Sequence, residues 1–410
     1  MDAKILIRAV EKAIAGGAVA APAQDFLGPD ASFVRTQTDV GIETAIFDAY
    51  VADLRADPKM AEFDGTFANV PHGGSIGVGL PNIARVLLAR ALVTQDVAGT
   101  VNAFIEAVHA NGTDAIAVMG IAGVKAEGPI QLGPDIRLIP MTDVPPSMQR
   151  GTALGQGPFN AMGPRFAIPH ALVTRFKFGP VFYRPKNPQP PEDMAARVPT
   201  DAAQMLLAEA FDLLAVLGVY PHYHMFWVQS DNWFLSAGMN SGWQFSRSGE
   251  HWARDADIST EEAEPLALEY FALDLRKRHK VLRIPLDRLG RAGREGDFAD
   301  RAIDLGIALE SLLLGDNDLG ELSFRLSLHG AWLIGNDEAE RLEIQKSLKK
   351  LYELRSRAVH SGAIERSAKT GTTIARATEI SQSLIRKAIE LKCEIDWQRL
   401  VVGGTPNSQA

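Results

Sequence analysis

The feature that most constrains the fold is a change in sequence pattern near residue 258. Before it, the chain carries most of its proline and glycine, and its apolar runs are short and bounded by turn residues. After it, apolar residues recur at helical spacing up to about Leu400. The pattern therefore predicts an α+β domain over residues 1–258 and an all-α helical bundle over residues 259–400. Residues 401–410 offer little that can be buried and are expected to form a disordered tail.

The first domain is predicted to contain both strands and helices. Short apolar runs bounded by turn residues predict strands at 115–121, 136–141, 171–178 and 223–228. Apolar residues at helical spacing predict helices at 82–93, 100–110 and 201–217. Residues 1–12 resemble a short amphipathic helix, and their frequent charges interrupt any apolar core of a signal peptide.

The second domain is predicted to begin at Ser259-Thr-Glu-Glu262, which offers a helix cap and acidic residues to a first helical turn. Glycines at 315, 335 and 362 mark helix ends. The predicted helices lie near residues 261–280, 296–314, 319–335, 337–359 and 371–393.

Composition and charge limit the class of protein. With 410 residues and 46% hydrophobic content, the chain can build two cores of normal size. A net charge of −8 argues against nonspecific coating of nucleic acid, which needs many cations to displace counterions from phosphates. Two stretches are nevertheless basic, 273–294 with eight Lys/Arg against two Asp and 341–360 with six against two Glu. Each stretch is either a solvated helix face or a surface that faces phosphate.

Cysteine use and hydropathy bear on the compartment. The single cysteine, Cys393, excludes an intrachain disulfide and cysteine-based zinc clusters, and it suits a reducing cytoplasm. It lies in a helical pattern, where we expect a small buried side chain. No run approaches the roughly eighteen apolar residues of a membrane span, so we expect a cytoplasmic protein without a membrane partner.

The main candidate for chemistry is Arg355-Ser-Arg-Ala-Val-His360, near the end of a basic helix. A permanent cation lies close to a side chain that titrates near neutral pH, which suits metal-independent cleavage of a phosphodiester. Five positions on an ideal helix place Arg355 and His360 about 140° apart, so they do not share a face. Ser356 and Arg357 do share faces with His360. Either the helix loosens before Gly362, or two chains contribute to one site.

The segment Leu351–Gly362 resembles the Arg-x4-6-His signature of HEPN domains, most closely the Apea-like branch. Residues 301–313, 321–332 and 352–356 also look like core helices of that family in the expected order. The resemblance covers roughly the last third of the chain. One departure is Ser356, since asparagine or aspartate often follows the arginine in HEPN nucleases.

The resemblance implies a homodimer that sets two such helices around a two-fold axis, and therefore a composite cleft. By analogy, His360 acts as general base or acid, Arg355 stabilises charge on the phosphate, and Ser356 binds the phosphate or His360. Tyr352 and Arg357 are supporting candidates. The reaction needs no metal and no cofactor, requires the 2′-hydroxyl of RNA and leaves a cyclic 2′,3′-phosphate.

The family also implies a biological setting. Apea-like HEPN domains typically follow a variable domain that senses phage or stress, so residues 1–258 are a candidate sensor or regulatory domain. We therefore expect a ribonuclease of a toxin, phage-defence or stress-response kind that acts on RNA. The sequence specifies neither the RNA target nor an antitoxin or trigger ligand.

Two further sets of residues on the predicted helices support the motif. Ile303, Ile307, Glu310 and Leu314 share one face, which places Glu310 at the margin of an apolar stripe, where a structural salt bridge is its ordinary role. Glu321, Arg325 and His329 line another stripe at i, i+4 and i+8. That stripe either orients Arg355, contacts RNA or forms an ion pair, and His329 is a secondary candidate.

The competing interpretation is a catalytically inactive dimeric sensor or scaffold. In that case Arg355 pairs with Glu353 or Glu310, and His360 only caps a helix end. The helical domain would then serve dimerisation and ligand binding.

Weaker motifs lie in the first domain. The glycine-rich residues 71–80 lack the lysine of a P-loop, which favours a plain turn. His222 and His224 would lie on one side of a strand, yet no third metal ligand can be named, so we predict no metal site. The tryptophans nearby are expected to be core residues; they are Trp227, Trp233, Trp243 and Trp252.

Overall fold

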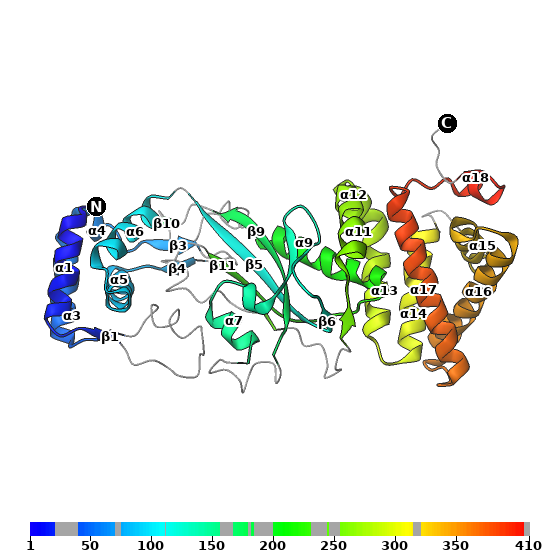
Figure 1. Ribbon diagram of the computed structural model, residues 1–410, viewed down its shortest axis with the longest axis horizontal. Coiled ribbons are helices and arrows are strands. Elements are labelled where there is room, and N and C mark those ends of the chain that lie inside the picture. The colour runs from blue at the N-terminus through cyan, green and yellow to red at the C-terminus, as the bar shows by residue number, and fades with distance from the viewer. Residues whose placement is uncertain are drawn as a thin grey trace. The chain divides into compact units, whose positions relative to one another are not determined.

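The computed structural model shows a mixed N-terminal region and a helical C-terminal region (Figure 1). It describes residues 1–20, 40–69, 75–110, 112–155, 167–178, 182–183, 200–230, 244–245, 255–314 and 321–405. The predicted order of an α+β part followed by an all-α part is confirmed at this level. Half of the predicted tail, residues 406–410, lies outside the described residues, and its first residue, Val401, is the last residue of a short helix.

The chain forms two compact units, and neither is one continuous stretch. Unit 1 comprises Met1–Ile121, Ile139–Leu207 and Tyr223–Ser248. Unit 2 comprises Ala122–Leu138, Ala208–His222 and Gly249–Ala410. Two segments that precede residue 258 therefore belong to the mostly helical unit, and the domain boundary at 258 stays a prediction.

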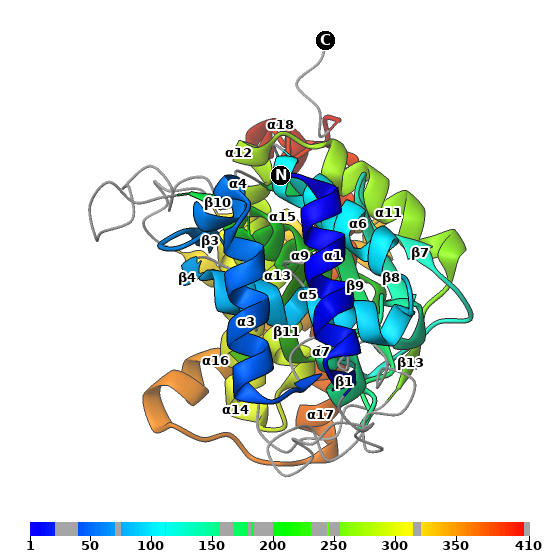
Figure 2. The ribbon, with the colours of Figure 1, turned by 90° about the vertical axis from the view of Figure 1, so that its left-hand side faces the viewer.

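Four helices of unit 1 pack around one apolar cluster: α1 (Ala3–Ala15), α3 (Thr44–Arg55), α5 (Leu80–Thr94) and α6 (Val97–His109). Helices α1 and α3 lie side by side (Figure 2). The side chains fully enclosed here include Leu6, Leu54, Ile83, Leu87 and Phe104. The predicted helices at 1–12, 82–93 and 100–110 are confirmed.

The main sheet of unit 1 has strands in the order β12-β11-β5-β9-β8. Their bounds are β5 (Thr113–Ala122), β8 (Ile136–Pro140), β9 (His170–Phe178), β11 (His222–Ser230) and β12 (Gln244–Phe245). Strand β5 is central and is buried on both faces, and it pairs antiparallel with β9 from Thr113↔Phe178 to Ile121↔His170. All four predicted strands are confirmed. Their apolar side chains pack with Met141 and with the short helix α7 (Met148–Ala153).

Shorter elements complete the region before unit 2's helices. One small sheet has the order β10-β3-β4, with β3 (Phe67–Asn69), β4 (Ser75–Gly77) and β10 (Phe182–Tyr183). Two-residue strands pair as β1 (Val19–Ala20) with β2 (Val40–Gly41), and in unit 2 as β6 (Val124–Lys125) with β13 (Ala256–Asp257). Also in unit 2, β7 (Ile130–Gln131) pairs with residues 137–138 of β8. Single turns lie at α4 (Pro58–Ala61) and η2 (Met141–Asp143).

Unit 2 is mostly helical, and six of its described helices begin with a side-chain cap. Asp or Ser accepts a backbone N–H of the first turn at Ser259, Asp274, Asp297, Asp337, Ser367 and Asp396. Gly335 and Gly362 end their helices as predicted, while Gly315 lies outside the described residues. The main helices are α11 (Thr260–Ala272), α13 (Arg283–Arg294), α14 (Phe298–Leu313), α15 (Leu322–Ile334), α16 (Glu338–Ser361) and α17 (Ala368–Glu390).

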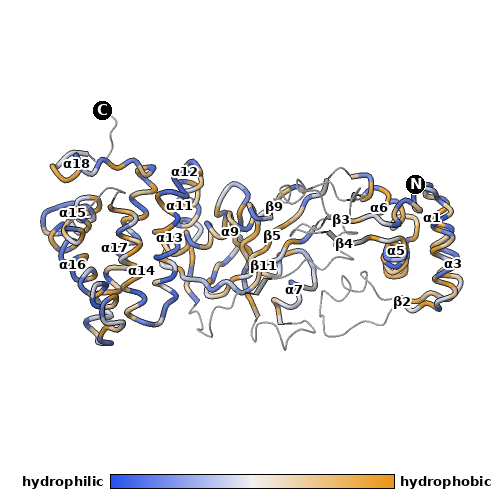
Figure 3. Tube along the Cα trace, turned by 180° about the vertical axis from the view of Figure 1, so that it is seen from behind, coloured by the Kyte–Doolittle hydropathy of each residue, from blue (hydrophilic) through white to orange (hydrophobic). Residues whose placement is uncertain are grey.

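Several short helical segments join or follow these. They are η3 (Leu214–Leu217) after α9 (Thr200–Leu213), α12 (Leu275–Lys277), the π-helical η4 (Arg278–Leu282) and α18 (Trp397–Val401). The predicted helix at 201–217 corresponds to α9 continued by η3. The helices carry apolar and polar residues in alternation along their length (Figure 3). Their apolar sides meet in a core that includes Leu305, Leu309, Leu348, Ile374 and Leu384.

Two predicted helices differ from the structure. The helix predicted at 261–280 ends at Ala272, and α13 at 283–294 was not predicted. Its buried residues share one helical face, but Pro285, Gly290 and Gly293 give the segment a low helix propensity, which favours a loop when the sequence is taken alone. The last helix ends at Glu390, and Cys393 lies beyond it in the left-handed region with φ 58°, not inside a helix. Burial of the thiol raises the pKa of Cys393 to about 11.

A largely enclosed carboxylate, Glu209, contacts several side chains at the π-helical turn of unit 2. Glu209 accepts a hydrogen bond from the Tyr270 hydroxyl at 3.1 Å, and its other oxygen lies 3.0 Å from Nε2 of His279. It also pairs with Nε of the buried Arg278 at 3.3 Å. The Arg278 guanidinium lies over the Phe271 ring, 5.0 Å from its centroid. Adjacent side chains of the π turn therefore converge on one carboxylate.

Replacing Glu209 with alanine is expected to lower the free energy of unfolding by about 3 kcal/mol, because Arg278 is then buried without its partner. Urea unfolding followed by circular dichroism measures the loss. Glu394→Ala is the control, since it breaks an ion pair with Lys277 at the surface and should cost much less. Equal losses in the two variants would show that Glu209 does not hold the turn.

Candidate functional site

The predicted motif lies in the last turns of an unbroken helix. Helix α16 starts after the cap Asp337 and continues to Ser361, where Gly362 adopts φ 72° and its N–H binds the Ala358 carbonyl. The helix does not loosen before Gly362, so the first of the two predicted geometries is wrong. Arg355 and His360 of one chain therefore lie about 140° apart around the helix axis.

Arg355 lies on the inner side of α16, against α14. Its Nη2 donates to Oε2 of Glu310 at 3.2 Å, and the two side chains are 27% and 24% exposed. The guanidinium lies 5.8 Å from the centroid of the Tyr352 ring. Of the two carboxylates predicted as possible partners, Glu353 and Glu310, the structure shows Glu310.

His360 lies on the outer side of α16 and is exposed. At spacings of three, four and seven residues, Lys346, Lys350 and Arg357 lie along the same face and are also exposed. We call these four residues the basic stripe of α16. The exposed Glu353 shares this face and leaves it with a net positive charge. In the described part of the chain, none of the four side chains of the stripe makes a hydrogen bond or an ion pair within 4 Å. The stripe spans about 21 Å, at 1.5 Å for each residue.

Ser356 and Tyr352 connect the two sides of the helix. Ser356 lies one turn before His360 and one turn after Tyr352, so the three share a strip of surface. Neither the Ser356 nor the Tyr352 hydroxyl has a hydrogen-bond partner among the described residues. Both hydroxyls are thus available to an anion that approaches between His360 and Arg355.

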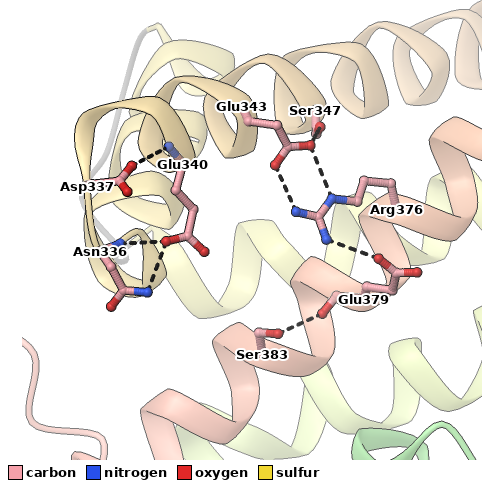
Figure 4. Close-up of polar contacts among 8 residues, drawn as sticks. All are labelled: Asn336, Asp337, Glu340, Glu343, Ser347, Arg376, Glu379 and Ser383. Carbon is pink, nitrogen blue, oxygen red and sulfur yellow. Dashed lines mark hydrogen bonds and ion pairs between the residues drawn. The ribbon is translucent and has the colours of Figure 1, made fainter.

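A second arginine that contacts α16, Arg376, makes more hydrogen bonds to carboxylates than Arg355 does. Figure 4 shows the contacts of Arg376. Arg376 of α17 binds both oxygens of Glu343, with Nη2–Oε2 at 2.8 Å and Nε–Oε1 at 3.2 Å, and its Nη1 binds Glu379 at 3.0 Å. These bonds lower the pKa of Glu343. Arg355 by contrast makes a single hydrogen bond to its carboxylate.

The supporting residues fall into different roles. Glu321 precedes α15 with φ 46°, and its carbonyl accepts the N–H of Arg325 at 3.0 Å. His329 is buried: its Nδ1 lies 2.8 Å from the Leu313 carbonyl, and its ring stacks on Trp397 at 4.7 Å. Of the alternatives predicted for the stripe of Glu321, Arg325 and His329, contact with RNA therefore does not suit His329, because its ring is buried.

The apolar side of α14 that is buried is not the face predicted from Ile303, Ile307 and Leu314. The buried residues of α14 include Ala302, Leu305 and Leu309, whereas Ile303 and Ile307 are only half-buried. Glu310 itself is half-buried and forms the predicted kind of salt bridge.

The weaker motifs contribute no site in the part of the chain that the structure describes. No group of three His, Cys, Asp or Glu residues there is arranged to hold a metal ion. Nor does any described helix combine the length and apolar character that a membrane span requires. Trp227 is fully buried, as predicted. The other three tryptophans and residues 71–74 of the glycine-rich segment lie outside the described residues.

In the basic stretch 273–294 several cations already have partners within unit 2, while Arg276 and Arg283 are exposed, so both of its interpretations stay predictions. Arg288 binds Asp304 at 2.7 Å, and Arg291 binds Asp287 at 3.0 Å. Arg294 lies over the Phe211 ring, 4.9 Å from its centroid. Most of these cations therefore already contact a carboxylate or an aromatic ring within unit 2. The sequence alone does not show these contacts.

A partly buried acid near Arg294, Asp212, is a feature that the sequence pattern did not indicate. Burial raises the pKa of Asp212 to about 7, although the charge of Arg294 opposes this. Asp212 follows Phe211 on α9, where it is one polar residue in an apolar helical pattern, and no local signal marks it as buried.

Comparison with models of protein families, with curated proteins and with solved structures found no match to this chain. The HEPN resemblance therefore rests on the motif and the three helix segments quoted above. Roles carried over from that family are proposals.

Asp212 predicts a dependence of stability on pH. Its pKa is about 7 in the folded chain against an ordinary value of 3.8, so folding favours the protonated acid. The stabilisation is fully present below about pH 4 and is lost as the pH rises through about 7. Asp212→Asn should remove this loss between pH 4 and 8 in urea unfolding, while Asp201→Asn, on the exposed start of the same helix, should retain it. A wild-type slope in the Asp212→Asn protein would contradict the assignment.

Proposed function

We propose that the helical C-terminal region is a metal-independent endoribonuclease of the Apea-like HEPN kind. The observation that carries the proposal is the basic stripe of α16, which ends in the exposed His360. Its exposed imidazole lies there beside three exposed cations without close partners among the described residues. This is the equipment for binding a phosphodiester and moving its protons.

The chemistry follows from the 2′-hydroxyl of RNA. Neutral His360 removes the 2′-hydroxyl proton, and the 2′ oxygen attacks the adjacent phosphorus. The bond from phosphorus to the 5′ oxygen breaks, and a protonated imidazole gives that oxygen its proton. The products are a 2′,3′-cyclic phosphate and a 5′-hydroxyl. Arg357 and Arg355 balance the charge that develops on the phosphate, with Ser356 as a hydrogen-bond donor.

A homodimer supplies the arrangement that one chain lacks. Arg355 and His360 lie on opposite sides of α16, and one helix has only one histidine in the motif. Two copies of α16 around a two-fold axis would bring a second imidazole and a second Arg355 to one cleft. The regular geometry of α16 up to Ser361 supports this composite site over a local distortion.

The biological role and location are inferred from the family resemblance and from the single cysteine. We propose a cytoplasmic toxin, phage-defence or stress-response ribonuclease, in which residues 1–258 sense a trigger and restrain the nuclease. The trigger, the RNA target and any antitoxin are not specified by the residues.

The second candidate function is a dimeric HEPN sensor or scaffold without activity. The observation that favours it is the ion pair between Arg355 and Glu310, because this arginine already has an acidic partner in the chain. Dimerisation without cleavage of RNA distinguishes this function from the nuclease.

His360→Ala is expected to lower the rate of RNA cleavage by at least about 100-fold, because it removes the general base. Labelled tRNA and mRNA are incubated with protein in EDTA, and the product ends are analysed for cyclic phosphate. His109→Ala is the matched control, since His109 is also an exposed histidine in the last turn of a helix. Full activity of His360→Ala, or products without cyclic phosphate, would refute the proposed mechanism.

The basic stripe predicts the salt dependence of RNA binding. Replacing Lys346 and Lys350 with alanine should reduce the slope of log binding constant against log salt by about 1.4, at about 0.7 for each lost phosphate contact. A 2′-O-methyl RNA, which cannot be cut, is titrated at several salt concentrations. Lys59→Ala, an exposed lysine on α4, is the control. An unchanged slope in the double variant would remove the stripe from the RNA interface.

A further inference from the structure

We propose that Gly306 of α14 is a positioning residue for Arg355, a role that rests on the function proposed above. A Cβ atom at Gly306 would lie 2.7 Å from Cγ of Arg355 and 3.4 Å from its Cβ. Real Cβ atoms essentially never approach another atom to 2.7 Å. Glycine therefore lets the aliphatic stem of Arg355 lie directly against α14.

Glu310 lies one helical turn after Gly306 and also contacts Arg355. We call Gly306 and Glu310 together the seat of Arg355. Gly306 and Glu310 are at i and i+4 on α14, so the stem and the guanidinium of Arg355 meet the same face of that helix. Glu310 Oε2 accepts from Nη2, while Nε of Arg355 is enclosed without a hydrogen bond. The arginine is thus held at two points, along its stem and at one terminal nitrogen.

The seat determines which part of the guanidinium can bind an anion. Nε is enclosed and Nη2 is engaged, whereas Nη1 has no partner among the described residues and is not enclosed. Arg355 can therefore offer one terminal nitrogen to a phosphate rather than a two-pronged fork. Displacing the stem from Gly306 would move this nitrogen away from the position that the seat fixes.

A double-mutant cycle tests the positioning role. Gly306→Ala should lower kcat/KM for RNA at least about tenfold, because it expels Arg355 from its seat. Arg355→Ala should lower it at least as much, and the double variant should be no worse than Arg355→Ala alone. An additive loss in the double variant would overturn the proposal, because it would mean that Gly306 acts independently of Arg355.

Gly330→Ala is the matched control for helix packing. A Cβ there would lie 2.6 Å from a methyl of Leu348, so this variant also presses a new atom against α16, but at an apolar side chain. Its effect on kcat/KM should be the same in the wild-type protein and in the Arg355→Ala variant, after correction for the folded fraction. Equal coupling of both glycines to Arg355 would overturn the specific role of Gly306.

A second readout does not depend on nuclease activity. The Nε proton of Arg355 is enclosed in the seat, so NMR should show slow exchange with solvent in the wild type and exchange at least about tenfold faster in Gly306→Ala. Fast exchange in both proteins would refute the seat. If no protein cuts or binds RNA, the proposed function fails, and this measurement alone decides whether Gly306 holds Arg355.

Discussion

The unbroken course of helix α16 from Glu338 to Ser361 is the constraint on which the whole candidate site depends. Because its hydrogen bonds continue to the last turn, every side chain of the motif takes the direction that a helical pitch assigns to it. Arg355 is directed at α14, and His360 is directed at solvent. On the outer face of α16, one chain therefore offers an exposed imidazole, His360, and neighbouring cations. An anion has to reach Arg355 from another direction, because Arg355 lies on the inner face of the same helix.

Charge is distributed unequally between the two basic stretches, and this difference carries functional meaning. In 273–294, Arg278, Arg288 and Arg291 pair with Glu209, Asp304 and Asp287, so carboxylates within the fold offset their charge. In 341–360 the residues of the basic stripe stay exposed without close partners among the described residues. Cations that the fold does not use are the ones free to displace counterions from a nucleic acid. A net charge of −8 hides this local surface.

The sequence was sufficient to predict helices and strands whose apolar residues recur with a strong periodicity. Strands such as β5, the helix ends at Gly335 and Gly362, and the opposite directions of Arg355 and His360 all follow from local patterns and helical geometry. What it could not decide was partnership between distant residues. The sequence left Glu353 and Glu310 open as partners of Arg355, and the structure shows Glu310, 45 positions away. The contact of Glu209 with His279, 70 positions apart, was not indicated by any pattern. The same limit explains the corrections: His329 has helical spacing from Arg325, yet the stacking on Trp397 that buries it comes from a separate helix. Single-sequence patterns report which face a residue occupies, whereas packing decides what that face meets.

The pairing of Arg355 with Glu310 is compatible with both proposed functions, and its strength indicates how each would operate. The pair is about a quarter exposed and makes one hydrogen bond, whereas Arg376 makes bonds to two carboxylates. Partly exposed pairs of this kind contribute only about 1 kcal/mol. A phosphate at the open Nη1 would add a charge-assisted hydrogen bond without having to break the one to Glu310. Glu310 therefore holds the arginine only weakly, and this contact is compatible with the proposed nuclease function.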